Sequence, residues 1–144
     1  MQPSPAQRVS VRASWRTDGS RRDGDSTVDF IRLDDWAAEH DVARVDLMKI
    51  DIDGNEFPAL HGAMRLITAS KPLLFMEAVF PHFADDARNP FRLLESIGYR
   101  FWEAKTKESF ADAAAIRAEL PEGDLAMTRS INVIASTSPL QIVS

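Results

Sequence analysis

The sequence VDLMKIDIDGNE, at residues 45–56, decides the fold. Apolar residues in its first part, 45–52, fall on both faces of an extended chain, which is typical of a strand that helices cover on each side. Asp51 and Asp53 come at its carboxyl end, and side chains two residues apart on a strand point to the same side. Gly54 then allows the backbone to turn sharply and to approach a ligand closely. The segment therefore predicts a buried strand that ends in two carboxylates at an open rim.

Strands and helices alternate after this segment. A proline in the first turn suits a helix over 55–69, and Lys71-Pro72 ends that helix. The periodicity predicts two more helices, over 91–97 and 110–120, and buried strands over 73–79, 99–102 and 130–136. This alternation is typical of an α/β fold with a mostly parallel sheet and helices on both of its faces. Ligands bind such sheets beyond the carboxyl ends of the strands.

The part of the chain before this segment is more polar. Residues 1–26 form an amino-terminal segment, in which alternation at 9–15 predicts a possible edge strand. A loop rich in Gly, Asp and Arg separates it from a second short strand, and the two strands could pair antiparallel. Asp34 or Asp35 is expected to cap the short helix that follows. We assign the main domain to residues 27–144.

Length and composition limit the classes of function. The 144 residues can bury a core as one domain, and the formal net charge of −5 does not favour binding to nucleic acid or to an anionic membrane. The chain has no cysteine, so disulfides, thiolate metal sites and a thiol nucleophile are excluded. We see no apolar run long enough to span a bilayer and no signal-peptide core, so we expect a cytoplasmic protein.

Five polar residues near the expected carboxyl ends of the strands are candidates for chemistry. Asp51 and Asp53 are candidate catalytic residues, because carboxylates at a strand mouth are costly unless they are solvated, paired or bound to a ligand. Glu56, where the next helix begins, and Glu77, on the next strand, are candidates for substrate binding. His82, in the loop after that strand, is a candidate general base. Asp53 and Glu56 could instead only cap the helix, and His82 could be an ordinary surface residue.

A divalent metal is a further possibility at the same place. Gly54 is the fourth residue counted from Asp51, whereas the calcium loop of an EF-hand needs glycine at its sixth position, so that motif is excluded. Mg²⁺ held by Asp51, Asp53 and Glu77 would be chemically reasonable, but nothing in the sequence requires it. We therefore assign no metal ligand.

Several motifs occur in a fixed order: Leu33-Asp34-Asp35, KIDIDGNE at 49–56, Leu60-His61-Gly62 and Gly98-Tyr99. In this order they resemble the FkbM family of S-adenosylmethionine-dependent methyltransferases, over about residues 27–103. The resemblance implies a class I methyltransferase fold, which is Rossmann-like, and S-adenosylmethionine as cofactor. It implies O-methylation of a hydroxyl on a sugar, glycan or secondary metabolite. It also implies that Asp51 orients the acceptor or holds a metal, in a step that depends mainly on orientation.

The first strands expected of that fold are missing from the sequence pattern. The first strand should end in a glycine-rich turn that binds the cofactor, but the six glycines include no G-x-G, so the cofactor-binding residues stay unknown. Strand 45–52 would then expose an apolar edge that invites self-association or a partner chain. Three hypotheses follow. The chain could be the C-terminal part of a methyltransferase that lost its beginning and is inactive alone, a degenerate domain that binds a partner or small molecule without catalysis, or one half of a split enzyme.

Overall fold

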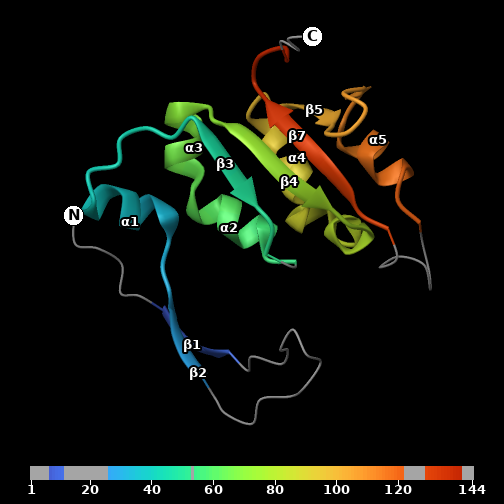
Figure 1. The fold of residues 1–144 in the computed structure, drawn as a ribbon. Helices are drawn as coiled ribbons and strands as arrows, with labels where there is room; N and C mark the ends of the chain where they lie inside the picture. The colour runs from blue at the N-terminus through green and yellow to red at the C-terminus, as the bar shows by residue number, and fades with distance from the viewer. Residues whose placement is uncertain (1–6, 12–25, 53, 122–128, 141–144) are drawn as a thin grey trace.

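The described part of the chain forms a five-stranded sheet and a separate two-stranded sheet (Figure 1). The computed structural model describes residues 7–11, 26–52, 54–121 and 129–140. The smaller sheet is an antiparallel pair near the amino terminus, which confirms the expected pairing there. Its strands are β1 (Gln7–Val11) and β2 (Ser26–Phe30). The larger sheet consists, in spatial order, of β3 (Leu47–Ile50), β4 (Leu73–Ala78), β7 (Ile131–Ser136), β5 (Arg100–Glu103) and β6 (Ser109–Phe110).

The directions of the strands correct the expectation of a mostly parallel sheet. Only β3 and β4 pair in parallel, whereas β7 lies between β4 and β5 and runs antiparallel to both, and β6 runs antiparallel to β5. The helices α2 (Glu56–Gly62) and α3 (Met64–Ser70) form the long crossover that a parallel pair needs. The short connection between β5 and β6 suits an antiparallel pair. The last strand enters between two earlier ones, and this makes the sheet mixed.

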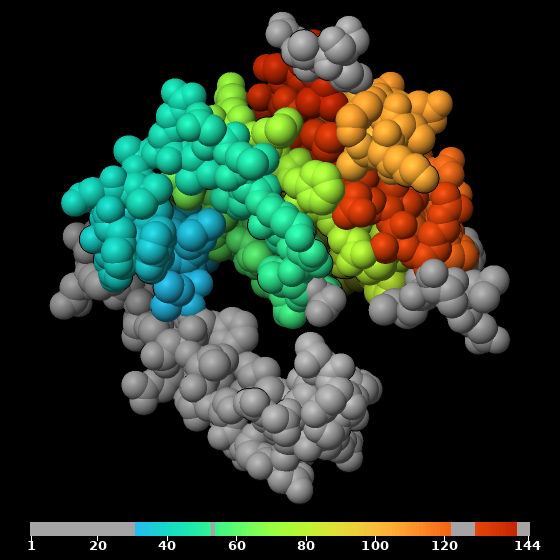
Figure 2. All heavy atoms as spheres, viewed as in Figure 1, coloured from blue at the N-terminus to red at the C-terminus, as the bar shows by residue number. Residues whose placement is uncertain are grey.

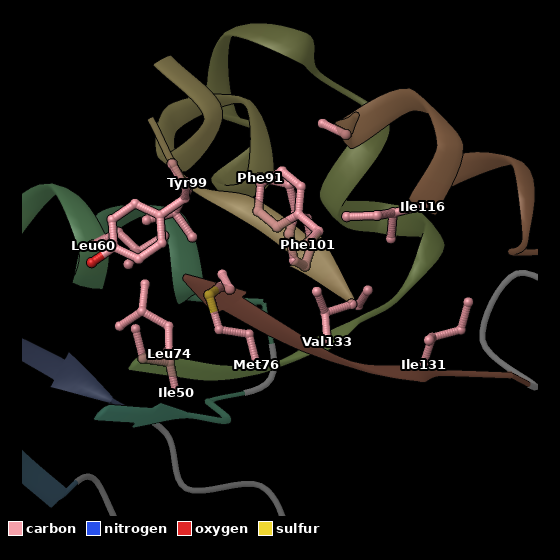
Figure 3. Close-up of a cluster of buried hydrophobic side chains, with 14 of the residues drawn as sticks. Ile50, Leu60, Leu74, Met76, Phe91, Tyr99, Phe101, Ile116, Ile131 and Val133 are labelled. Carbon is pink, nitrogen blue, oxygen red and sulfur yellow. The ribbon is translucent and has the colours of Figure 1, made fainter. Parts of the chain in front are cut away.

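The helices lie on one face of the larger sheet and enclose the core with it. Besides α2 and α3 they are α1 (Leu33–Glu39), α4 (Pro90–Ser96) and α5 (Ala113–Ala118), with the short 3-10 helices η1 (Phe80–Phe83) and η2 (Asp86–Arg88). Figure 1 shows α2, α3 and α4 behind β3, β4 and β7. Leu74, Met76 and Val133 of the sheet are fully buried in one cluster with Leu60 and Phe91 of the helices (Figure 3). No helix of the described ranges is long and apolar enough to cross a membrane.

The opposite face of the sheet carries none of the described helices, so the expected covering of both faces is wrong for this part of the chain. Leu47 pairs with Leu73, Phe75 pairs with Ile134, and Ile134 pairs with Trp102, which places all five side chains on this face. Leu47 is 63% exposed and Leu73 is 37% exposed, while the other three are half-buried. Figure 2 shows β3, β4 and β7 at the surface on this side. We call the surface formed by these five residues the bare face.

The outer edge of β3 is open in the described structure, as the sequence predicts. No described strand pairs with this edge, because the β1–β2 hairpin forms a sheet of its own. Unpaired backbone N–H and C=O groups at such an edge can pair with another chain. The open edge and the bare face lie next to each other, since Leu47 belongs to both.

Two expected helices have different bounds in the structure. The helix expected over 55–69 is interrupted at Ala63, which separates α2 from α3. The helix expected over 110–120 begins only at Ala113, after the short strand β6. Asp112 sets this start, because its Oδ1 atom accepts a hydrogen bond from a backbone N–H in the first turn of α5.

Candidate functional site

Two of the expected site residues lie at the carboxyl ends of the parallel strands. Asp51 directly follows β3, and its side chain is 46% exposed and lies 3.0 Å from Lys49 Nζ. Lys49 pairs with Phe75 across the β3–β4 ladder, so the alternation places Asp51 and Glu77 at the next positions on the same face. Glu77 is half-buried. We call the end of the sheet that carries Asp51 and Glu77 the rim, and ligands of α/β sheets bind at such a place.

The second expected carboxylate, Asp53, lies outside the described residues, so its place beside Asp51 stays a prediction. The neighbouring Gly54 has a φ of +92°, which confirms the sharp turn expected after the strand. Within the described ranges, no group of three or more His, Asp or Glu side chains could hold a metal ion. The Mg²⁺ site considered from the sequence includes Asp53 and therefore also stays a prediction.

Glu56 and His82 form a buried pair between the ends of the two parallel strands. Glu56 begins α2 and His82 belongs to η1, and their side chains are 2% and 5% exposed. Glu56 Oε2 lies 2.8 Å from His82 Nε2, and Glu56 Oε1 accepts a hydrogen bond from the Ile52 N–H. His82 Nδ1 accepts a hydrogen bond from the Val79 N–H, so the proton of a neutral ring is on Nε2, beside Glu56. The pair therefore ties the turn after β3 to the turn after β4.

This placement joins two residues that the sequence presents separately. Nothing in the separation of Glu56 and His82 along the chain indicates that they meet. Despite their close approach, neither Glu56 Oε2 nor His82 Nε2 has a well-aligned hydrogen bond to a described residue. Removing one partner of such a pair leaves a buried polar group uncompensated, which is strongly destabilising. The role of Glu56 in substrate binding and the role of His82 in catalysis both remain predictions. The geometry adds a structural role for both residues.

A small hollow opens beside His82. It has a volume of about 260 Å³ and lies between the turn after β3, the start of α2, and the segment from η1 to the start of α4. Most of its lining is apolar, and the lining residues are Gly54, Phe57, Pro58, Pro81, His82, Ala84, Asp85, Arg88 and Pro90. We call this hollow the His82 notch.

A larger open groove, of about 890 Å³, lies where β6, α5 and the start of β7 meet. Its lining includes Phe75 of the bare face and Asn132, which pairs with Glu77 across the β4–β7 ladder. The groove thus extends toward the rim. Other parts of its lining, such as Thr106 and Ser109, offer hydroxyl groups. Its volume is in the range, about 300–1,000 Å³, that is typical of small-molecule sites.

Asp34 and Asp35, from the first of the family-like motifs, hold two helices together. The side chain of Asp34 is 1% exposed, and its oxygens accept hydrogen bonds from the N–H groups of Arg65 and Leu66, at 3.1 and 3.0 Å. Asp35 forms an ion pair with Arg65 at 2.9 Å. The expectation that one of them caps its own helix is wrong, because the N-cap of α1 is Arg32 and has no side-chain bond. Asp34 instead caps α3, whose separate start the sequence pattern does not reveal.

The described glycines do not form a cradle for S-adenosylmethionine. Gly62 packs inside the helix layer, where an added Cβ would lie 3.7 Å from Arg32 Cα, and Gly98 follows α4 with a φ of +91°. Gly54 makes a single turn and has no second glycine beside it. A nucleotide cradle needs several backbone groups that approach the ligand closely at a strand-to-helix turn. The described residues alone therefore do not fit the cofactor.

Comparison with known proteins agrees with the sequence motifs. Residues 3–101 match the family model described as the Methyltransferase FkbM domain. The match covers more than half of the chain and includes Asp51, Glu56, Glu77 and His82. Searches for similar curated proteins and for similar solved structures found no match. The family match confirms the resemblance seen in the sequence, and the chain belongs to the FkbM methyltransferase domain family.

Proposed function

We propose that this chain carries the acceptor side of an S-adenosylmethionine-dependent O-methyltransferase. Family membership supports methyl transfer in general. The observation that supports the acceptor side is the rim, where Asp51, directly after β3, and Glu77, near the end of the adjacent parallel strand β4, lie on one face. The acceptor is a hydroxyl of a sugar, glycan or secondary metabolite, and the open groove that extends toward the rim has room for such a molecule.

In this proposal Asp51 orients the acceptor hydroxyl and takes its proton as the hydroxyl reacts. The ion pair with Lys49, at 3.0 Å, holds the carboxylate in place, and its partial exposure keeps it within reach of a ligand. Glu77 accepts a hydrogen bond from a second hydroxyl of the acceptor. A positioned base contributes about 10²–10⁴-fold to the rate of such a step. Asp53 and His82 are the further catalytic residues that the sequence predicts.

The methyl donor needs elements that the described residues do not supply. We propose that a strand and a helix, from a partner chain or from another part of the protein, pair with β3 and cover the bare face. The open edge of β3 and the bare face adjoin each other, so one strand with one amphipathic helix would cover both. A second copy of this chain could also pair at the edge, but it would bring no glycine-rich turn, because the sequence has no G-x-G.

A binding domain without catalysis is the second candidate function. The lack of a cofactor cradle among the described residues favours it. Such a domain would keep the groove and the rim as a ligand site, and it would bind an acceptor-like molecule or a partner without transferring a methyl group.

Transfer of a radiolabelled methyl group from S-adenosylmethionine to a panel of sugars and glycans tests the proposal. The chain is assembled with a polypeptide that carries the first strands and the glycine-rich turn of the family, and Asp51→Asn is compared with Asp46→Asn. Asp46 is a matched control, because it precedes β3 at the opposite end, where its side chain is 76% exposed and pairs with Arg44.

We expect Asp51→Asn to lower methyl transfer by about 10²–10⁴-fold. We expect Asp46→Asn to leave it unchanged. Full activity of Asp51→Asn would show that the Asp51 carboxylate at the rim takes no part in methyl transfer. An assembled chain that binds acceptors and transfers no methyl group would favour the binding domain.

A further inference from the structure

The backbone that carries Asp51 extends beyond the ladders of the sheet. The ladder between β3 and β4 ends at the pair Ile50–Met76, one residue before Asp51, and no described strand pairs with the outer edge of β3. The next residue, Ile52, is 42% exposed, so its side chain does not anchor this turn in the core. Backbone with few buried contacts opens easily, so a contact outside the ladder is needed to fix the position of Asp51.

The Glu56 carboxylate supplies such a contact. Its Oε1 atom accepts a hydrogen bond from the Ile52 N–H at 3.2 Å, directly after Asp51. The Ile52 carbonyl accepts hydrogen bonds from Asn55, which lies in the same turn and does not connect it to the rest of the fold. Glu56 itself is anchored, because it begins α2 and Leu60 of that helix is fully buried in the core.

His82 fixes the Glu56 carboxylate from the side of β4. Its Nε2 atom lies 2.8 Å from Glu56 Oε2, and its Nδ1 atom accepts a hydrogen bond from the Val79 N–H at 3.4 Å. Val79 directly follows β4 and comes two residues after Glu77. The His82 notch opens between the same two turns, so packing does not fill the space beside the pair. The two side chains thus connect the backbone next to Asp51 with the backbone next to Glu77.

The same contacts keep both side chains away from a ligand. The side chains of Glu56 and His82 are 2% and 5% exposed, and both ring nitrogens of His82 face protein groups. We propose that Glu56 and His82 are positioning residues, which hold the Asp51 carboxylate opposite Glu77 at the rim. This role rests on the proposed function, and it assigns the pair to the placement of Asp51 in place of contact with the substrate.

Amide hydrogen exchange, followed by NMR on the chain alone, tests the connection between the two turns. His82→Asn keeps an acceptor near the position of Nδ1 for the Val79 N–H and removes the atom that faces Glu56. We expect the Ile52 N–H to exchange about tenfold faster, although this amide lies on the other turn, because its hydrogen bond to a charged group is weakened. Glu56→Gln keeps the size of the side chain and removes its charge, so it should raise the same exchange rate about fivefold and remains measurable if the His82 variant does not fold.

Glu95→Gln is the matched control. The Glu95 carboxylate accepts a hydrogen bond from the Ala113 N–H, also at 3.2 Å, but this bond joins α4 to α5 and lies apart from the two turns. The Ala113 N–H should exchange faster in this variant, and the Ile52 N–H should not. Unchanged Ile52 exchange in both variants of the pair, or an equal rise with Glu95→Gln, would overturn the positioning role.

The assembled enzyme of the proposed function tests whether the pair acts through Asp51. Displacement of a reacting group by about 1 Å can cost about 10²-fold in rate, so we expect Glu56→Gln to lower kcat by about 10–10²-fold and to leave the KM for S-adenosylmethionine unchanged. In the Asp51→Asn background the same change should have little further effect, because residues that act as a unit are not additive. An equal loss in both backgrounds would mean that the pair only stabilises the fold, and would overturn the proposal.

The two measurements separate this proposal from the proposed function. Full activity of Asp51→Asn would refute the catalytic role of Asp51, whereas the exchange of the Ile52 N–H needs no methyl transfer and still decides whether Glu56 and His82 hold the turn.

Discussion

Replacing Asp34 should destabilise the chain far more than replacing its neighbour Asp35. Asp34→Ala removes two charged acceptors from the start of α3 and leaves the N–H groups of Arg65 and Leu66 without partners. A hydrogen bond to a charged group contributes about 1.5–3 kcal/mol, and loss of a helix cap costs about 0.5–2 kcal/mol. These effects overlap, so we expect the free energy of unfolding to fall by about 3 kcal/mol. Asp35→Ala removes a partly exposed ion pair, which is worth about 0–1 kcal/mol.

Urea denaturation followed by far-ultraviolet circular dichroism measures both losses. With a slope of about 1–3 kcal/mol per molar urea, Asp34→Ala should lower the midpoint by about 1–3 M, and Asp35→Ala should barely change it. Asp34→Asn keeps the size of the side chain and one acceptor oxygen, so it gives a smaller loss that remains measurable if the alanine variant does not fold. Midpoints that coincide for the Asp34 and Asp35 variants would refute the assignment of Asp34 as the cap of α3.

Two other predictions concern the core and the bare face. Burial raises the pKa of Tyr99 to about 12, and its hydroxyl donates a hydrogen bond to the Pro72 carbonyl at 3.0 Å. Because the folded chain keeps this proton, the stabilisation is complete below about pH 10 and is lost as the pH rises toward 12. Tyr99 is the only tyrosine, so ultraviolet absorbance of the phenolate follows it directly, and a midpoint near 10 in the folded chain would contradict its burial. Leu73 and Leu74 are adjacent on β4 but face opposite sides, so Leu74→Ala should cost about 2–5 kcal/mol of unfolding free energy and Leu73→Ala less than about 1 kcal/mol. Equal losses in urea denaturation would mean that the bare face is covered.

The positions of the strands could be predicted because apolar runs and turn residues are local signals. The strands expected over 73–79, 99–102 and 130–136 correspond to β4, β5 and β7, and Gly54 turns the chain as expected. Strand direction could not be predicted in the same way, because each buried strand looks alike whichever way it runs. The insertion of β7 between β4 and β5 is a long-range event that no local pattern records.

The candidate site, like the fold, could be predicted only where local patterns decide it. The rule that alternate residues share a face brings Asp51 and Glu77 to one face at the rim, once the register of β3 and β4 is known. The contact between Glu56 and His82 was not predictable, because it depends on how two turns pack against each other. The capping of α3 by Asp34 was missed for the same reason, since a carboxylate before a helix signals a cap but does not say which helix it caps.

Calorimetric titration of the chain alone with S-adenosylmethionine tests the acceptor-side assignment most directly. The described residues offer the cofactor no glycine-rich cradle, so we expect no saturable heat at millimolar cofactor. Adding the polypeptide that carries the glycine-rich turn should make binding appear. Saturable binding at micromolar cofactor by this chain alone would contradict the assignment, because the chain would then contain the donor site itself.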